Sequence, residues 1–134
     1  MRFVISETFP CNANQLRSSC LVIDPITGNA SKACTIWDTG ASCSCISPAI
    51  AERLKLPIVG STTSHTAGGS TPSNKHVVDI KVGNIIFPKV AVTAPNLPDD
   101  LVLIGMDIIG LGKFTVQNMD VDGESRKVLT LELP

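Results

Sequence analysis

The stretch Thr35-Ile36-Trp37-Asp38-Thr39-Gly40-Ala41-Ser42 decides the fold of this chain. Its apolar pair Ile36-Trp37 leads into an aspartate that is followed by a hydroxyl residue and a glycine, the residue types that favour tight turns. A second apolar run, Leu101-Val102-Leu103-Ile104, also ends on a glycine, Gly105. The pattern predicts a strand that delivers one carboxylate into a turn, and a second strand that ends in the same way.

With these two motifs the chain resembles the retropepsin-like aspartic proteases, which are single-domain relatives of pepsin that work as homodimers. Asp38-Thr39-Gly40 matches the catalytic triplet of that family, and Leu103-Ile104-Gly105 matches its second motif, two aliphatic residues and a glycine. The resemblance extends from about Cys34 to Asn118. It implies an all-β, closed, barrel-like acid protease fold with a flap hairpin and one or two short helices, assembled as a homodimer.

The resemblance also implies a role for each residue of the triplet. Asp38 is the shared acid and base, and the Thr39 hydroxyl bonds across the dimer axis to the turn of the partner. Gly40 lacks a Cβ, so the two turns can approach each other. These three are the candidate catalytic residues, and the candidate supporting residues under the turn are Trp37, Leu103, Ile104 and Gly105.

Peptide hydrolysis by carboxylates needs two such groups that share one proton. One takes a proton from the attacking water while the other hydrogen-bonds the carbonyl oxygen of the substrate, and two carboxylates this close cannot both be ionised. The chain carries a single Asp-Thr-Gly, at Asp38. Two-fold symmetry supplies an identical second aspartate, so the mechanism itself predicts a homodimer.

A polar stretch, Ser61–Thr71, contains the pair Gly68-Gly69 and is followed by a strand pattern over Lys75–Val82. Two arms that meet at a glycine pair predict a β-hairpin whose tip can adopt positive φ and approach a ligand. The resemblance implies that this hairpin is the flap that closes over bound peptide; without it, an ordinary surface loop is the alternative. The candidate substrate-binding residues are Ala41, Ser42, Ala67, Gly68, Gly69 and Ser70.

Length and composition are those of one small domain that spans residues 1–134. Hydrophobic residues make up 43% of the chain and aromatic residues only 4%, so the core must consist mostly of Val, Ile and Leu, which favour strands. The net charge of −1, with no basic run, speaks against nucleic acid or an anionic membrane as partner. No apolar stretch approaches the roughly 20 residues that span a bilayer.

The five cysteines indicate a reducing compartment, because their number is odd and no export signal is apparent at the N-terminus. We therefore expect reduced thiols and a cytoplasmic location. A zinc site at Cys43 and Cys45 is the alternative, but only one residue separates the two thiols and no histidine pair follows. A Cys–His hydrolase that pairs one of these thiols with His65 is a further alternative. We expect no metal and no cofactor.

Local patterns place the remaining elements around the two motifs. Ser47 and Pro48 are typical of an N-cap and a first helical position, which predicts a helix that continues to Leu54. A second helix of barely two turns is predicted over Met106–Gly112, where Asp107 could cap the helix or brace the active-site turn. Strands are predicted over residues 2–9, 20–23, 32–37, 43–46, 75–82, 85–87, 90–94, 101–105, 114–119 and 128–133.

The sequence thus predicts an aspartic endopeptidase that acts on polypeptide substrates through two Asp38 carboxylates. A non-catalytic dimerisation or peptide-binding module with the same fold is the alternative. Intact Asp38-Thr39-Gly40 and Gly68-Gly69 motifs favour the enzyme, because a site without function would be free to lose either.

Overall fold

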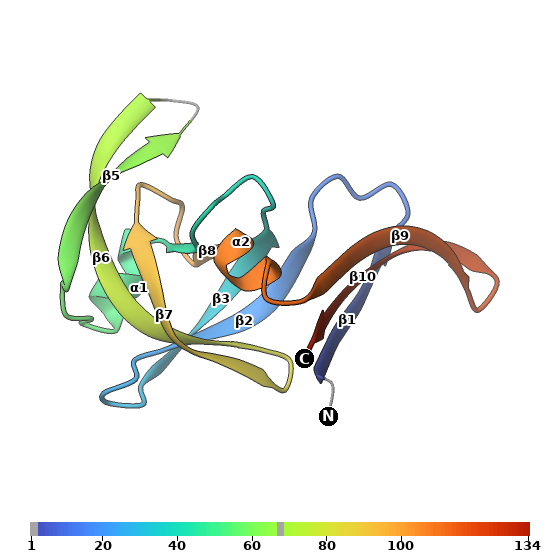
Figure 1. Ribbon diagram of the computed structural model, residues 1–134, viewed down its shortest axis with the longest axis horizontal. Coiled ribbons are helices and arrows are strands. Elements are labelled where there is room, and N and C mark those ends of the chain that lie inside the picture. Colours follow the sequence, from blue (N-terminus) through green and yellow to red (C-terminus); the bar gives the residue numbers. More distant parts are fainter. Residues whose placement is uncertain (1–2, 67–68) are drawn as a thin grey trace.

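The computed structural model describes residues 3–66 and 69–134. Over these residues the chain forms ten strands and two short helices (Figure 1). The strands are β1 (Phe3–Pro10), β2 (Arg17–Ile23), β3 (Ala30–Trp37), β4 (Cys45–Ile46), β5 (Gly60–Thr66), β6 (Gly69–Val82), β7 (Ile85–Ala94), β8 (Leu101–Ile104), β9 (Lys113–Val121) and β10 (Glu124–Leu133). The helices are α1 (Pro48–Arg53) and α2 (Met106–Ile109).

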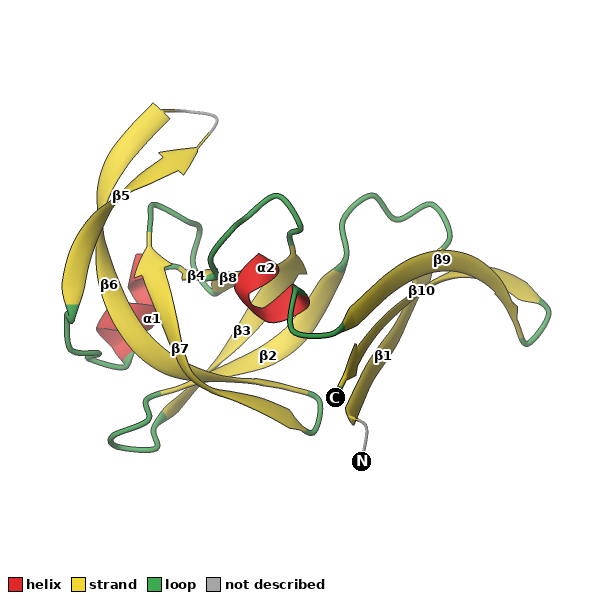
Figure 2. Cartoon of the chain, viewed as in Figure 1, coloured by secondary structure: helices red, strands yellow, loops and turns green. Residues whose placement is uncertain are grey.

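A closed barrel forms the body of the molecule (Figure 2). The larger sheet has the strand order β2-β3-β8-β4-β7-β6-β5, and β2 also pairs with β6, which closes six of these strands into a ring. β5 lies outside the ring and pairs with β6 alone. The predicted all-β, barrel-like fold with short helices is therefore confirmed.

A second sheet carries both ends of the described chain. Its order is β1-β10-β9, all antiparallel, with Phe3 paired to Leu133 at one end (Figure 1). Ile5, Leu129 and Leu131 of this sheet are buried in the same apolar cluster as the barrel residues. The small sheet is therefore packed onto the barrel and shares its apolar core.

Branched aliphatic side chains fill the core, as the composition predicted. Ile46, Ile80, Val102 and Ile104 are among those that are completely buried. The single Trp, Trp37, lies at the end of β3. Its indole Nε1 donates to Ser18 Oγ at 2.8 Å, and Ser18 in turn donates to the carboxylate of Glu7. This chain of bonds ties β3 to β2 and to β1, immediately before Asp38.

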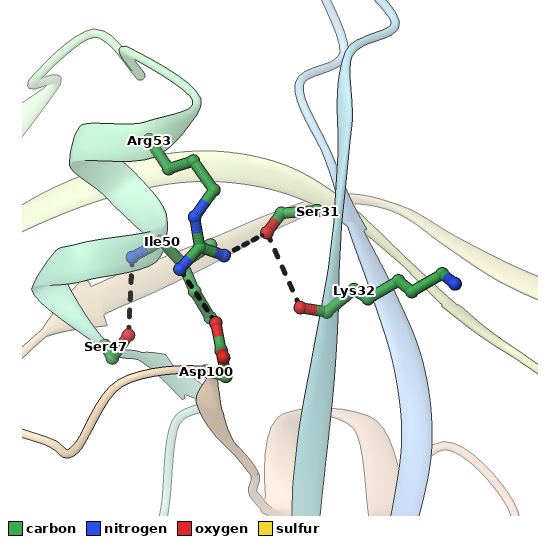
Figure 3. A network of polar contacts seen from close by, with 6 residues as sticks. All are labelled: Ser31, Lys32, Ser47, Ile50, Arg53 and Asp100. Carbon is green, nitrogen blue, oxygen red and sulfur yellow. Dashed lines mark hydrogen bonds and ion pairs between the residues drawn. The ribbon is translucent and has the colours of Figure 1, made fainter.

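Helix α1 begins as the sequence predicted. Ser47 Oγ accepts from the backbone N–H of Ile50 at 3.3 Å, and Pro48 occupies the first turn. Arg53, at the other end, forms an ion pair with Asp100 at 2.8 Å and donates to Ser31 Oγ at 2.5 Å (Figure 3). Both charged groups are about half exposed, so the pair adds little stability and chiefly orients the helix against β3.

β7 and α2 differ in kind from the sequence prediction, whereas other strands differ in where they begin or end, as β4 does, predicted over residues 43–46 and observed over Cys45–Ile46. β7 is one strand rather than two, because Lys89 continues the chain at a φ of 50° and its N–H donates to the Asp79 carboxylate at 2.8 Å. Helix α2 has one turn rather than two, and it ends where Gly110 N–H donates to Met106 O at 2.8 Å. Within the described residues, no helix is long and apolar enough to cross a membrane.

Candidate active site

Asp38 stands at the end of β3, beside the second motif. β3 and β8 run parallel, with Ile36 paired to Leu103 and Trp37 paired to Ile104. The backbone N–H of Asp38 continues the ladder and donates to Ile104 O at 2.9 Å. The two stretches that the sequence singled out, 66 positions apart when counted from Asp38 to Ile104, therefore lie side by side.

A tight turn then holds the carboxylate. Ala41 N–H donates to Asp38 O at 3.2 Å, and Gly40 N–H donates to Asp38 Oδ1 at 2.9 Å. A Cβ at Gly40 would lie 3.2 Å from that same oxygen, so glycine leaves the close approach undisturbed. Asp38 is half-buried, whereas Thr39 and Gly40 are exposed. The carboxylate is thus fixed on one side and open on the other.

Helix α2 braces the segment that follows the turn. Asp107 accepts from the backbone N–H of Ser44 at 3.0 Å and from its hydroxyl at 2.7 Å. Ser44 Oγ also accepts from Gly105 N–H at 3.1 Å, and Ala41 O accepts from Met106 N–H at 2.8 Å. Four bonds therefore tie residues 41–44 to the start of α2.

Gly105 permits this close packing. A Cβ at this position would lie 2.7 Å from Ala41 O and 2.9 Å from the carbonyl group of Cys43, closer than side chains approach backbone. The glycine of the second motif is thus required by the proximity of the two segments. Ser44, which is completely buried, was not among the predicted site residues. No sequence signal marks it, since its partner lies on a distant element.

A cleft of about 660 Å³ opens in front of Asp38. The turn contributes Gly40, Ala41 and Ser42 to its lining, so two of the predicted substrate-binding residues do face the same space as Asp38. Of the predicted supporting residues, Leu103 also lines the cleft, whereas Trp37 and Ile104 are buried in the core. The opposite wall comes from β5, β6, β7 and the loop that follows β7, and includes Thr62, Thr63, Ser64, His65, Lys75, Thr93, Pro95 and Leu97.

The polar stretch after Gly60 is a hairpin that extends beyond the ring (Figure 1). β5 and β6 pair from Gly60 opposite Lys75 to Thr66 opposite Gly69, and Gly69 has a φ of +119°. Ser70 Oγ bonds the Nδ1 of His65 at 2.7 Å. Gly69 and Ser70 are exposed near the tip, while Ala67 and Gly68, two further predicted substrate-binding residues, lie outside the described residues.

The thiols near Asp38 have no catalytic setting. Cys43 and Cys45 both line the cleft, but burial raises the pKa of Cys45, and so disfavours the nucleophilic thiolate. The ring of His65 bonds Ser70 rather than a thiol. In the described part of the chain no three His, Cys, Asp or Glu side chains are grouped to hold a metal ion. The geometry favours neither a Cys–His hydrolase nor a zinc site here.

Comparison with known proteins points to one family. Residues 25–111 match the family model described as "gag-polyprotein putative aspartyl protease". The fold resembles a retropepsin-like aspartic protease from Rickettsia conorii, with a TM-score of 0.58 at 20% identity over 99% of this chain and 96% of that one. No curated protein sequence matches the chain.

Two viral proteases are similar in fold over a smaller part of the chain. The EIAV protease, solved in complex with the inhibitor HBY-793, has a TM-score of 0.57 at 21% identity, covering 74% of this chain and 88% of that one. The simian foamy virus (mac) protease has a TM-score of 0.50 at 20% identity, covering 71% of this chain and 92% of that one. At these identities the likeness is one of fold.

Proposed function

We propose that this chain, which belongs to the retropepsin-like aspartic protease family, is an endopeptidase that acts through Asp38. The observation that carries the proposal is a single half-buried carboxylate, fixed by Gly40 N–H at 2.9 Å, that opens into a cleft of about 660 Å³. That volume is large enough for several side chains of a peptide. Two such carboxylates, one from each subunit of a homodimer, would activate the attacking water.

In the proposed reaction, one Asp38 is ionised and takes a proton from water. The other is protonated and donates to the carbonyl oxygen of the scissile peptide bond, so that the water oxygen adds to the carbonyl carbon. The bond between carbon and nitrogen then breaks, and the nitrogen leaves with a proton from the pair. One subunit offers one Asp38, so neither role can be filled without a second chain.

Two exposed features beside the carboxylate support a partner at this position. Thr39 is exposed, and its side chain makes no hydrogen bond within the part of the chain that the structure describes. Met106, which begins α2, exposes 43% of its surface. An exposed hydroxyl with no hydrogen bond among the described residues, and an exposed apolar side chain on the residue whose N–H donates to Ala41 O, suit a contact with a second copy of the turn.

The β5–β6 hairpin is proposed as the flap. It stands on the opposite wall of the cleft from the Asp38 turn, and its residues Thr62 to His65 line that wall. Gly69 and Ser70 are exposed, so this end of the hairpin can contact a peptide that lies in the cleft. We also assign Ala67 and Gly68 to the proposed flap, because in the sequence they lie between its two strands.

We also propose a cytoplasmic location. All five cysteines, Cys11, Cys20, Cys34, Cys43 and Cys45, have free thiols. Free thiols are the rule in a reducing compartment, whereas an oxidising one favours disulfides.

An inhibitor that mimics the tetrahedral intermediate of peptide hydrolysis tests the assignment. Such a molecule should raise the melting temperature of the native chain, because it binds the folded state alone. Asp38→Asn should remove that shift together with peptidase activity, whereas the matched exposed variant Asp120→Asn should retain both. A chain that folds and dimerises but neither binds the inhibitor nor cuts any peptide would instead be a non-catalytic module.

A further inference from the structure

A second pocket, of about 370 Å³, lies behind the wall of the cleft. β6 and β7 form that wall, where Asn74 pairs with Ala94 and Lys75 pairs with Thr93. Successive side chains of a strand point to opposite faces. Lys75 and Thr93 accordingly line the cleft, and Asn74 and Ala94 line the second pocket. The two cavities are therefore separate, with one layer of sheet between them.

Helix α1 and the segment that follows it supply the other walls. Pro48 and Ala51 are spaced three positions apart and share one face of α1, and Lys55 lines the pocket from just beyond the end of the helix. Leu56 and Ile58 extend the apolar lining, and Ile58 exposes 63% of its surface at the rim. The walls are thus mainly apolar, which suits an apolar guest.

One buried polar side chain faces this space. His76 is only 3% exposed, and its Nδ1 lies 2.9 Å from Pro57 O. A carbonyl oxygen can only accept, so Nδ1 carries the proton, and in the uncharged ring Nε2 is an acceptor. Nε2 has no hydrogen-bond partner within the described residues. Every fully buried side-chain nitrogen or oxygen in the described residues has a hydrogen-bond partner. Since Nε2 has none, it must be partly accessible to solvent.

We propose that this pocket is a binding site for a small neutral ligand, an apolar ring that carries one O–H or N–H donor. The ring would occupy the space between α1 and the β6–β7 wall, and its donor would bond Nε2 of His76. The volume lies at the lower end of the range of about 300 to 1,000 Å³ that is usual for ligand pockets. The site is distinct from the cleft, so its occupancy does not depend on catalysis by Asp38.

para-Cresol and its methyl ether form a matched pair of probes, because they share the ring and differ in the hydroxyl donor. Both are titrated into the native, isotopically labelled chain, and backbone amide shifts are followed by NMR. We expect saturable shifts at Ala51, Asn74, His76 and Ala94 with para-cresol, and roughly tenfold weaker binding of the ether, since it cannot satisfy Nε2. The amides of the Asp38 turn should not respond.

His76→Phe provides the second arm, because it keeps an aromatic ring and removes Nε2. In this variant para-cresol should bind no more tightly than the ether, while the ether itself should bind as it does to the native chain. Equal affinities of the two probes for the native chain would overturn the proposal, as would shifts confined to the cleft or no saturable shift at all. Should the variant not fold, the two probes on the native chain decide the question alone.

Discussion

The carboxylate of Asp107 holds Ser44 by two hydrogen bonds, one to its backbone N–H at 3.0 Å and one to its hydroxyl at 2.7 Å, across 63 positions of sequence. Ser44 Oγ passes the connection on by accepting from Gly105 N–H at 3.1 Å. The segment after the Asp38 turn is thereby fixed to the helix that follows the second motif. Its position is set by polar bonds to Ser44, which is completely buried, and buried polar bonds require strict geometry.

Ser44→Ala should therefore loosen the turn as well as the fold. It leaves the Asp107 carboxylate and Gly105 N–H with one partner fewer each, and we expect a loss of roughly 1 to 3 kcal/mol in the free energy of unfolding. On the proposed function, kcat should fall more than KM rises, because Asp38 loses its fixed place. Urea denaturation and peptidase kinetics measure the two effects. The exposed variant Ser125→Ala is the control, and equal stability of both variants would contradict the prediction.

Gly105→Ala should be costly although it adds a single methyl group. Its Cβ would lie 2.7 Å from Ala41 O, and backbone must shift to admit it. We expect a loss of roughly 1 to 3 kcal/mol, as for overpacked cores. Gly60→Ala is a matched control, because a Cβ there meets the Lys75 side chain at an ordinary 3.5 Å. Thermal melts of both variants would test the prediction, which fails if Gly105→Ala melts no lower than Gly60→Ala.

Gly69→Val should impair turnover more than stability. The φ of +119° at Gly69 is one that a β-branched residue rarely adopts, so the substitution distorts the end of the β5–β6 hairpin. β5 lies outside the barrel ring, so the damage stays local and the melting temperature should change little. We expect a lower kcat/KM in a peptidase assay. Unchanged turnover would mean that this hairpin is not the flap.

A mixing experiment tests the shared site. If Asp38→Asn chains still pair with native chains, an equal mixture places about half of the native chains in heterodimers by random exchange. Such heterodimers hold a single carboxylate and should be inactive, so activity should fall to about half and excess mutant should abolish it. Subunit exchange is followed independently with a labelled chain. Constant activity across the series, once exchange is complete, would exclude the shared site.

Alkaline pH should destabilise the fold through Cys20. Burial, with a smaller contribution from neighbouring Cys34, raises the pKa of Cys20 from 9.0 to about 12. The unfolded chain therefore loses this proton first, so stability is complete below pH 9 and falls as the pH rises toward 12. Through this group the free energy of unfolding falls by at most about 1.4 kcal/mol per pH unit.

Cys20→Ala should remove that slope while lowering stability at neutral pH, because it leaves a small cavity. Urea denaturation of both chains between pH 8 and the alkaline limit of the fold measures the difference. Alkylation at pH 8 gives a second test, since the exposed Cys11 and Cys43 should react and Cys20 should not. If the free energy of unfolding fell equally with pH in the native chain and in the variant, the assignment of this pH dependence to Cys20 would be contradicted.

The Asp38 turn, the helix start and the all-β character could be predicted because their signals are local, whereas the closed barrel was implied by the resemblance to a known family. Asp38-Thr39-Gly40 and Ser47-Pro48 each specify a turn or cap within a few residues, and the low aromatic content favours a core of branched aliphatic side chains. Leu103-Ile104-Gly105 could be paired with the first motif because the chain resembles a family that has both.

Other features could not be predicted, because they depend on contacts between distant elements. The sequence predicts that Asp107 caps the helix or braces the active-site turn, but nothing near Ser44 identifies that residue as its partner, and nothing near His76 signals a cavity beside α1. The β1-β10 pairing joins the two ends of the chain, which is a fact of topology rather than of any one segment. β7 continues through Lys89, whose N–H donates to the carboxylate of Asp79, ten positions away, and a strand pattern does not reveal this contact.

β6 mechanically couples two parts of the molecule, because this single strand of 14 residues belongs to both. Its second half is anchored in the ring by β2 and β7, and its first half rises with β5 above the cleft. Pairing with β7 begins at Asn74, so the described pairs of β6 from Gly69 to Ser73 are with β5. At about 3.3 Å per residue, the arm from Gly69 to Ser73 is roughly 15 Å long, so a tilt of about 10° at its base moves its tip by roughly 3 Å. Asn74 and His76 lie in the part of β6 that is paired with β7, next to the base of this arm.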